Sequence, residues 1–354
     1  MNMGNKICFF SQMYQAIPSL VSVQRELGGI FVCGRSSTVR YFKKEYPELG
    51  FARYNKRFKR FSAGHKAMLN AECIVTGSPY KSLLSPYSAK KLMVFHGTYA
   101  GLSAKAVQGL QHFDHLFLTG ERMLLRHKKG REFSYTKTGF IPFSQFPEKN
   151  TLNSQRVLEV LGLDASLKTI VYCPSRRGVG SWELCAEDYL IMRPHPSQSM
   201  NLRWHEKSAM KALQVAAKKR GNTLVDMIDV ALPDVLMVAD LFISDANSPS
   251  EEVLFYNTPQ LLTGLGNSSY ANIEQSLIDR GMVPEDLGEV LQVFDCAPVY
   301  AEEAYGNWGQ AVAEALSSEA VYAEKREACF QSIFGRRDRN AGHRVAEIIS
   351  SEYL

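Results

Sequence analysis

Short hydrophobic runs alternate with longer, helix-length segments along the first half of the chain. The run Ile7–Phe10 precedes a polar turn and a segment, Ile17–Leu27, that ends at a glycine pair before the next run, Ile30–Cys33. Such alternation is typical of buried strands and helices in a mostly parallel sheet that is covered on both faces. The same pattern predicts a helix at 36–46 and further strands at 73–75, 91–95, 115–118 and 135–139.

A second series of the same kind begins after a polar stretch at 148–153, which we interpret as a linker. Two α/β domains are also expected because 354 residues are more than one core usually spans. We predict an amino-terminal domain at 1–150, a carboxyl-terminal domain at 151–335 and a terminal helix at 336–354. In the second half, strands are predicted at 169–174, 190–194, 241–245 and 260–262, and helices at 154–163, 207–219, 251–256 and 341–353.

The composition is that of a folded protein with a positive charge. Hydrophobic residues make up 45% of the chain and charged residues 22%, and the formal net charge is +5. This content is ordinary for a globular protein and excludes a disordered chain. The positive excess suits anionic partners such as nucleotides, phosphate polymers or the inner face of a membrane. No RNA-binding motif is visible, so nucleic acid is not an expected partner.

The cysteines and the lack of long apolar segments indicate the cellular compartment in which the protein is expected. Seven cysteines are dispersed without a CxxC pair, which favours free thiols in a reducing environment over a disulfide framework. The first ten residues are too short and too weakly apolar for a signal peptide. No stretch reaches the roughly 18 apolar residues of a spanning helix. We therefore expect a cytoplasmic protein, either soluble or peripheral on the inner face of the cell membrane.

The predicted strand at 91–95 leads directly into His96-Gly97-Thr98. A histidine that leaves a buried strand at a glycine-containing turn is partly exposed and held in place. Its ordinary pKa of about 6.5 allows it to take or give a proton near neutral pH. The alternative interpretation, equally open for an isolated histidine, is a ring that only hydrogen-bonds a nearby carbonyl.

Two further strand ends combine arginine with residues that shape a loop. The motif Arg193-Pro194-His195-Pro196 has a backbone constrained by two prolines, and its guanidinium and imidazole could both address a phosphate. The motif Ser175-Arg176-Arg177-Gly178 adds two more cations after another strand. A rigid connector and a solvated arginine pair are the simpler alternatives for these two motifs.

The fourth strand end is the segment 244–252, a turn rich in hydroxyl and amide groups that leads into a helix with acidic residues. A helix start offers backbone N–H groups to a phosphate. Ser248 or Ser250 could instead cap the helix, and one turn can serve both purposes. No residue spacing indicates a metal cage. Asp245, Glu251 and Glu252 could contact a magnesium ion (Mg2+), and the metal requirement is left open.

The segment 54–61 interleaves four cations with aromatic rings. Such a pattern could dock on anionic lipid headgroups or on a polyanionic acceptor. A solvated loop or helix face is an equally good interpretation.

In their order along the chain, these motifs resemble the CDP-glycerol glycerophosphotransferase family, which polymerises teichoic acids and related capsule chains. The Lys/Arg-Pro-His-Pro loop of that family is matched fully, and the resemblance runs from about residue 92 to residue 349. The chain departs from the family pattern at Ala246-Asn247 and at Glu251-Glu252, close to the expected donor. The matching segments are Phe95-His96-Gly97-Thr98, Thr138-Gly139-Phe140-Ile141-Pro142, Tyr172-Cys173-Pro174-Ser175-Arg176-Arg177, Arg193-Pro194-His195-Pro196, 232–245 and 342–349.

The resemblance implies a GT-B-like fold of two Rossmann-like domains that face a cleft, with a terminal helix crossing back to the first domain. It implies an enzyme that moves a polyol phosphate from a CDP-activated donor, bound mainly by the second domain, to the hydroxyl of a lipid-linked or polymeric acceptor on the first. We predict His96 and His195 as catalytic residues and assign contacts with the donor to Thr98, Ser175, Arg177, Arg193, Ser244, Asp245, Asn247, Ser248 and Glu252.

Two alternatives stay open on the same fold. UDP-sugar 2-epimerases also have a Ser-Asp-Ser turn followed by glutamates, and such an enzyme needs no acceptor. A glycosyltransferase that uses a nucleotide sugar for a cell-surface polysaccharide would release a nucleoside diphosphate instead of a monophosphate. A non-catalytic nucleotide-sensing protein is less favoured, because two histidines at strand ends would then lack a task.

Overall fold

The protein is described by a computed structural model, in which the chain forms two α/β units. The first unit includes Met1–Gln145 and Ile333–Leu354, and the second includes Phe146–Asp279 and Val283–Ser332. The structure describes residues 6–98, 109–125, 133–174, 190–194, 204–220, 223–225, 229–263, 270–279, 282–300 and 308–354.

The first unit is built on a fully parallel seven-stranded sheet in the order β3-β2-β1-β4-β5-β6-β7. Its central strands are short and completely buried, as expected when helices cover both faces. The pairing is in register, with Ile7 opposite Cys73 on one side and Cys8 opposite Ile30 on the other. The strands are β1 (Ile7–Phe10), β2 (Ile30–Cys33), β3 (Phe51–Arg53), β4 (Cys73–Thr76), β5 (Lys90–Val94), β6 (His115–Leu118) and β7 (Tyr135–Lys137).

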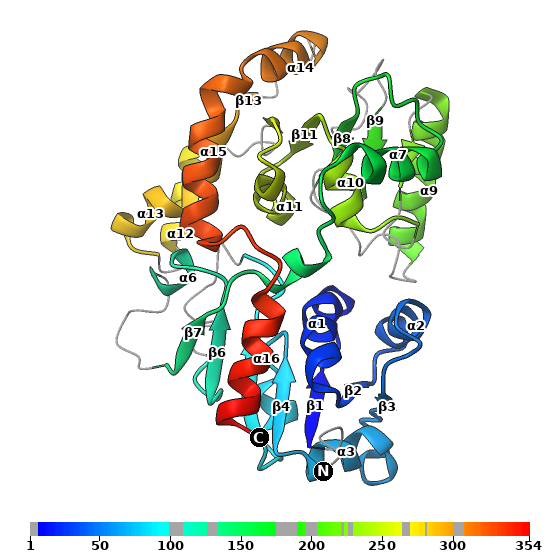
Figure 1. The fold of residues 1–354 in the computed structure, drawn as a ribbon, viewed down its shortest axis with the longest axis vertical. Helices are drawn as coiled ribbons and strands as arrows, with labels where there is room; N and C mark the ends of the chain where they lie inside the picture. The colour runs from blue at the N-terminus through cyan, green and yellow to red at the C-terminus, as the bar shows by residue number, and fades with distance from the viewer. Residues whose placement is uncertain are drawn as a thin grey trace. The chain divides into compact units, whose positions relative to one another are not determined.

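Helices of this unit begin and end where the sequence provides the appropriate residues. Helix α1 has Pro18 in its first turn and ends at Gly28, whose φ of 71° an L-residue adopts only with strain. Its neighbour is the terminal helix α16, which packs along it (Figure 1). The helices are α1 (Ile17–Leu27), α2 (Ser36–Glu45), α3 (Ala63–Asn70), α4 (Lys81–Leu84), α6 (Arg122–Leu125) and α16 (Ala341–Glu352), with 3₁₀ turns η2 (Tyr14–Ala16), η3 (Lys59–Phe61) and η4 (Ile141–Gln145).

Close approach and hydrogen bonds attach the carboxyl-terminal segment to the first unit. A side chain at Gly342 would come within 3.1 Å of Ser22 on α1, so two small residues allow the helices to meet. The Arg344 Nε donates to the Thr138 carbonyl oxygen at 2.8 Å, and both Nη atoms of Arg344 bind Asp338. The terminal helix therefore belongs to the unit formed by the other end of the chain.

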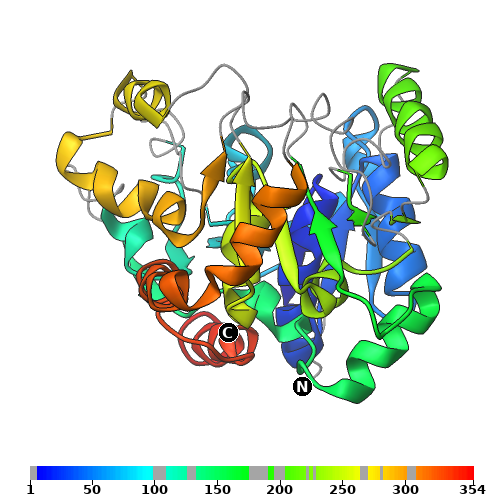
Figure 2. The same cartoon turned by 90° about the horizontal axis from the view of Figure 1, so that it is seen from above.

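The second unit has a six-stranded parallel sheet in the order β10-β9-β8-β11-β12-β13. Helices flank its strands in both views (Figure 1, Figure 2). The strands are β8 (Ile170–Tyr172), β9 (Leu190–Met192), β10 (Thr223–Leu224), β11 (Leu241–Ser244), β12 (Gln260–Thr263) and β13 (Val299–Tyr300). The helices are α7 (Thr151–Leu161), α9 (Trp204–Arg220), α10 (Leu232–Val238), α11 (Ser248–Glu252), α12 (Tyr270–Asp279), α13 (Pro284–Leu291), α14 (Trp308–Ser317) and α15 (Glu319–Phe334), with 3₁₀ turns η6 (Val253–Tyr256) and η7 (Gln292–Cys296).

The predicted parallel α/β fold class is confirmed, and the strands that the sequence pattern missed share one property. The unpredicted strands are β3, β10 and β13, which have two or three residues each and lie at sheet edges. An edge strand pairs on one side only and needs no long apolar run, so the hydrophobic pattern does not reveal it.

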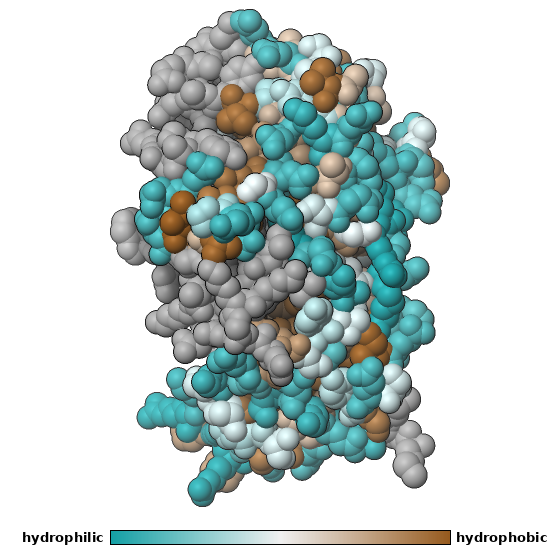
Figure 3. All heavy atoms as spheres, turned by 90° about the vertical axis from the view of Figure 1, so that its left-hand side faces the viewer, coloured by the Kyte–Doolittle hydropathy of each residue, from teal (hydrophilic) through white to brown (hydrophobic). Residues whose placement is uncertain are grey.

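The surface is of mixed hydropathy, and the described cysteines are free thiols, as the composition predicts. On the face drawn in Figure 3, hydrophobic residues lie among hydrophilic ones. None of the helices in the described part of the chain has the length and hydropathy of a membrane span. The six cysteines within the described ranges are all buried and form no disulfide.

Gly120 provides a test of how the end of α15 packs on the first sheet. This residue follows β6, and a side chain there would overlap the carbonyl of Ile333 and lie 2.8 Å from its carbon. We expect Gly120→Ala to lower the free energy of unfolding by about 1–3 kcal/mol in urea denaturation, because backbone atoms must shift to admit the methyl group.

The matched control is Gly288→Ala in α13, where a side chain would meet nothing within 4 Å. This substitution should stabilise the protein by about 0.5–1 kcal/mol, because alanine is the better helix former. Equal stability of Gly120→Ala and the unsubstituted protein would contradict the packing described here.

Candidate functional site

In each sheet the order of the strands reverses at one point, called the switch point. Ligands of α/β proteins bind at the sheet edge beside such a point. The chain runs outward from β1 to β3 and then crosses to β4 on the other side, and it repeats this course with β8, β10 and β11. The resulting order is the 3-2-1-4-5-6 order of doubly wound nucleotide-binding sheets, in which the ligand lies beyond the carboxyl ends of the strands at the reversal. The candidate sites are therefore the strand ends around β1 and β4, and around β8 and β11.

In the first unit, His96 lies two residues after β5, between the buried residues Phe95 and Thr98. Its Nδ1 lies 2.7 Å from the carbonyl oxygen of Gly77, which follows β4. Because a carbonyl oxygen only accepts, Nδ1 must hold the proton, and the neutral ring keeps its lone pair on Nε2. Burial lowers the pKa of His96, and the hydrogen bond to Gly77 offsets this in part. The imidazole is thus a neutral base at neutral pH.

Gly77 brings the start of helix α1 close to this histidine. A side chain on Gly77 would lie 2.5 Å from the Ala16 side chain, immediately before α1, and 3.6 Å from Nδ1 of His96. Three loops, which follow β1, β4 and β5, therefore meet beside the switch point of the first sheet. Glycine is required at this position because of the close approach, although none of the predicted motifs includes it. The available sequence feature is Thr76-Gly77-Ser78, another glycine turn at a strand end.

Gln12 holds the loop after β1 and was also not predicted. Its Oε1 accepts hydrogen bonds from the backbone N–H groups of Arg35 at 2.9 Å and Gly34 at 3.3 Å. Its own N–H donates to the Tyr80 hydroxyl at 3.0 Å, and its carbonyl accepts from Thr38 at 2.8 Å. These bonds join the ends of β1 and β2 and keep the edge of the sheet rigid. No sequence pattern marks a lone glutamine for this role.

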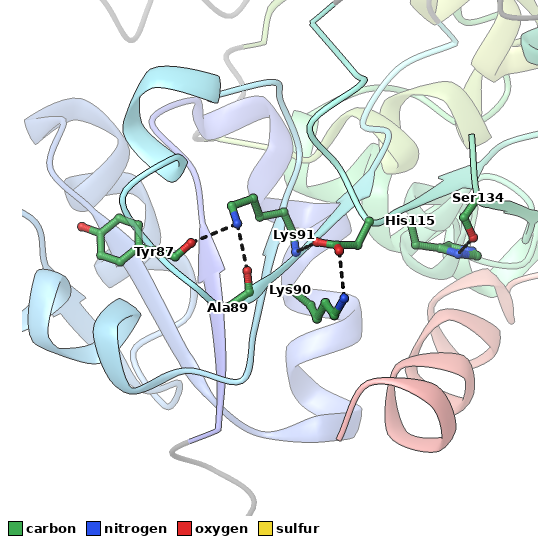
Figure 4. Close-up of polar contacts among 7 residues, drawn as sticks. Tyr87, Ala89, Lys90, Lys91, His115 and Ser134 are labelled. Carbon is green, nitrogen blue, oxygen red and sulfur yellow. Dashed lines mark hydrogen bonds and ion pairs between the residues drawn. The ribbon is translucent and has the colours of Figure 1, made fainter. Parts of the chain in front are cut away.

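His115, in contrast, is part of a brace at the opposite end of the same sheet. Its Nδ1 contacts the Ser134 hydroxyl at 2.8 Å (Figure 4). Its Nε2 contacts the Thr136 hydroxyl at 3.1 Å. Burial lowers its pKa as well. Nearby, the Lys91 ammonium donates to the carbonyls of Tyr87 and Ala89 at 3.0 Å each (Figure 4). Since both ring nitrogens contact hydroxyls at the amino ends of the strands, this histidine is structural.

In the second unit, the turn 244–248 joins the two strands at the switch point. The Asn247 side-chain amide donates to the Cys173 carbonyl oxygen, beyond β8, at 2.6 Å and to Asp245 at 3.1 Å. The carbonyl of Ser244 accepts from the Thr263 hydroxyl at 3.2 Å, which ties β12 to the same point. Ala246 adopts a φ of 56°, a conformation that is rare for residues other than glycine. The turn is therefore fixed by bonds to both neighbouring strands.

Two polar atoms in this turn lack a hydrogen-bond partner among the described residues. They are the hydroxyl of Ser244, a residue with no exposed surface, and the buried Oδ1 of Asn247. A buried polar atom without a partner costs roughly 1–3 kcal/mol, so its retention is explained if a ligand supplies the missing bond. Asn247 precedes α11 but does not cap it, because its side chain is directed to Cys173 instead. Ser248 is exposed, and Ser250 bonds back to the carbonyl of Asn247.

Charged groups gather around Cys173 at the end of β8. Burial raises the pKa of the Cys173 thiol to about 12, with Arg193 lowering it and Asp245 and Glu252 raising it further. Desolvation, with the neighbouring Glu251 as the smaller cause, raises the pKa of the partly buried Glu252 to about 8. Glu252 is thus largely protonated at neutral pH. Within the described ranges, no group of three or more His, Cys, Asp or Glu residues is arranged to hold a metal ion.

Arg193 is buried, with 3% of its surface exposed, and it binds the protein's own backbone. Its Nη1 donates to the carbonyls of Val230 at 2.7 Å and Val225 at 3.4 Å, which lie between β10 and α10. This nitrogen holds a loop, so any phosphate contact of Arg193 must use its other donors.

The structure brings together five of the predicted site residues and leaves others apart or undescribed. Arg193, Ser244, Asp245, Asn247 and Glu252 lie around the end of β8 and β11, and Ser248 is exposed beside them. His96 and Thr98 belong to the first unit. Ser175, Arg177 and His195 lie outside the described residues, and the functional roles of the whole set stay predictions.

Comparison with solved structures reveals likenesses over nearly the whole chain. The chain is similar to the wall teichoic acid polymerase TagF with a TM-score of 0.71 and 14% identity, covering 99% of this chain and 90% of that chain. It is also similar to a protein from Listeria monocytogenes described as a UDP-N-acetylglucosamine 2-epimerase (TM-score 0.58, 13% identity, 99% and 97% covered) and to a glycosyltransferase from Rickettsia africae (TM-score 0.55, 13% identity, 99% of both chains).

No protein-family model and no curated protein matches the sequence. At such low identity the structural likeness concerns the fold, which many chemistries can share. The chain therefore has the GT-B-like fold that the resemblance of its motifs implies.

The raised pKa of Glu252 predicts how stability depends on pH. The folded protein binds this proton up to about pH 8, whereas the unfolded chain releases it near the ordinary value of 4.5. The free energy of unfolding should therefore fall as the pH rises between these values. We expect Glu252→Gln to flatten this fall and to be at least about 1 kcal/mol more stable than the unsubstituted protein near pH 8.5.

Urea denaturation at a series of pH values measures this difference, with Glu289→Gln at an exposed position of α13 as the matched control. The control should keep the slope of the unsubstituted protein. Identical slopes for Glu252→Gln and Glu289→Gln would show that Glu252 is ionised at neutral pH.

Proposed function

We propose that this protein is a transferase of the CDP-glycerol glycerophosphotransferase type. It moves a polyol phosphate from a nucleotide-activated donor to an acceptor hydroxyl in the synthesis of a cell-surface polymer, such as a teichoic acid or a capsule chain. The first unit binds the acceptor and the second unit binds the donor. The observation that supports this proposal best is the position and protonation state of His96.

His96 meets the requirements of a general base. It lies at the carboxyl edge of a parallel sheet beside the switch point, its ring is oriented by Gly77, and the lone pair of the neutral imidazole is on Nε2. Burial lowers its pKa, which keeps the ring unprotonated at neutral pH. A positioned base of this kind typically contributes about 10²- to 10⁴-fold to the rate.

The donor pocket is proposed at the turn 244–248 and the adjoining strand ends. The Ser244 hydroxyl and the Asn247 Oδ1 have no partner among the described residues and can bind donor groups. Ser244 and Asn247 lie at the switch point of a sheet with the order found in nucleotide-binding folds. Arg177 and His195 complete this pocket in the proposal, as groups that bind the diphosphate and stabilise charge during transfer.

The proposed reaction is an in-line transfer at phosphorus. His96 Nε2 accepts the proton of the acceptor hydroxyl while the oxygen attacks the phosphorus that bears the polyol. A new P–O bond forms, the bond to the nucleoside monophosphate breaks, and the electron pair leaves with that monophosphate. No oxidant or reductant is needed.

The likeness to the wall teichoic acid polymerase TagF supports this reaction class, since the chain matches that enzyme over 99% of its own length. The order of the His-Gly-Thr, Arg-Pro-His-Pro and Ser-Asp motifs supports it independently of the fold.

A second candidate is favoured by one observation in the second unit. Glu252 has a pKa of about 8 and follows Glu251 after the Ser-Asp turn, so one carboxyl is held as a proton donor. Proton transfer at a sugar carbon by such a group would fit a UDP-sugar 2-epimerase, and a protein so described shares the fold. A glycosyltransferase that releases a nucleoside diphosphate is the third possibility on this fold.

The test is the transfer reaction itself, followed as release of CMP from CDP-glycerol in the presence of a glycerol phosphate polymer acceptor. We expect His96→Ala to lower kcat by about 10²- to 10⁴-fold, because the base is removed. Donor binding, measured by thermal shift, should stay unchanged. The acidic limb of the kcat/KM profile should lie below pH 6.5, since the pKa of His96 is lowered from that value.

The matched control is His343→Ala at an exposed position of α16, which should leave the rate unchanged. A thermal-shift series with CDP, UDP and GDP and their common conjugates separates the candidates. Stabilisation by UDP-N-acetylglucosamine alone, with formation of the 2-epimer, would replace the proposed activity with the second candidate. Full transfer activity of His96→Ala would remove His96 from the mechanism.

A further inference from the structure

The positive charge of the chain is concentrated in one short segment of the first unit. Residues 49–71 contain six Lys or Arg and no Asp or Glu. Without these six, the 41 Lys and Arg of the chain fall to 35, against 36 Asp and Glu, so the segment accounts for the whole positive excess. The six are Arg53, Lys56, Arg57, Lys59, Arg60 and Lys66, and all except the half-buried Lys59 are exposed.

Carboxylates in the described ranges do not pair with these cations. The acidic residues that bound the segment, Glu48 and Glu72, pair with Arg25 at 2.9 Å and Lys6 at 2.8 Å, outside it. Within the described part of the chain, no ion pair joins any of the six cations to a carboxylate. The field of this segment is therefore available to an external anion.

Two aromatic rings lie exposed among these cations. Phe61 is 85% exposed and Phe58 is 57% exposed, whereas Tyr54 of the same segment is buried against Phe10. Leu69 on α3 is 52% exposed. Tyr54 and the half-buried Phe51, whose ring lies 5.7 Å from that of Phe42, thus anchor the segment, whereas Phe58 and Phe61 are exposed to solvent.

Local hydrogen bonds order the backbone that carries these rings. The Asn55 side chain accepts from the N–H groups of Arg57 at 2.9 Å and Phe58 at 3.1 Å, which shapes the turn before η3. The Ser62 hydroxyl accepts from the N–H of His65 at 3.0 Å and caps α3. The backbone before Phe58 and after Phe61 is therefore fixed by hydrogen bonds.

We infer that the surface formed by Arg53, Lys56, Arg57, Phe58, Arg60, Phe61, Lys66 and Leu69, here called the basic aromatic surface, docks on a membrane that contains anionic lipids. The cations approach the lipid phosphates, and the two phenylalanine rings enter the interface between headgroups and acyl chains. The inference is independent of the proposed function.

Charge and apolar exposure together favour a lipid surface over a soluble polyanion. A polyanion would neutralise the cations but would leave Phe61 in water. A lipid interface removes apolar surface from water as well, and each of these contributions strengthens the binding.

The test is flotation of the full chain with vesicles of phosphatidylcholine, either alone or mixed with phosphatidylglycerol. We expect binding to the mixed vesicles that weakens at high salt. Lys56→Ser with Arg60→Ser should lower the partition coefficient roughly fivefold for each charge removed. Phe61→Ser should lower it about tenfold, because the ring no longer enters the interface.

Matched controls come from exposed positions of the second unit. Val321→Ser, at a residue that is 66% exposed, controls for Phe61→Ser, and Lys218→Ser with Lys219→Ser controls for the charge pair. Both control variants should bind like the unsubstituted protein. Because Phe61 is exposed, its substitution should leave the melting temperature and the thermal shift with donor unchanged. A failure of the membrane inference can therefore be told apart from a failure of the proposed function.

Three results would each overturn the inference. The first is equal binding to neutral and anionic vesicles, and the second is loss of binding in the control variants to the same extent. The third is the absence of flotation, and tight binding of soluble polyphosphate that Phe61→Ser leaves unaltered would then identify the surface as a polyanion site.

Discussion

The parallel pairing of short, fully buried strands is the constraint on which both units depend. A strand such as β1 has almost no exposed surface, so its four residues must all be apolar and helices must cover both sides of the sheet. Parallel pairing also sends the carboxyl ends of all strands to one edge. Polar residues that follow different strands, far apart in sequence, are thereby brought to a common edge in each unit, where chemistry can be assembled without polar groups in the core.

At these edges the backbone does much of the positioning. The carbonyl of Gly77 decides which nitrogen of His96 is protonated, and the carbonyl of Cys173 decides where the Asn247 amide points. In each case a residue after one strand orients a residue after a neighbouring strand. The sites are rigid because the sheet holds the two strands in register, and the polar side chains then have few other arrangements available.

How far the sequence predicts this structure can be seen from particular elements. The buried strands and the helices α1 and α16 were predicted because apolar runs and glycine or proline positions mark them. The edge strands β3, β10 and β13 were not predicted, since a strand of two or three residues that pairs on one side only needs no apolar run. The roles of Gly77 and Gln12 could not be predicted from the sequence. They depend on contacts with Ala16 and with the loop after β2, which no local sequence pattern indicates. Arg193 shows the same limit, because only the fold reveals that its Nη1 binds the carbonyl of Val230.

The sequence by itself determined the class of fold, the order of the strand-end motifs and the concentration of positive charge at 49–71. These are properties of local composition and periodicity, and they persist in whichever way the elements pack. The tertiary structure decided the tautomer of His96, the raised pKa of Glu252, the tie between Asn247 and Cys173 and the outward direction of Phe61. Each of these depends on burial or on a hydrogen bond to a residue brought near by folding, and neither quantity exists along an extended chain.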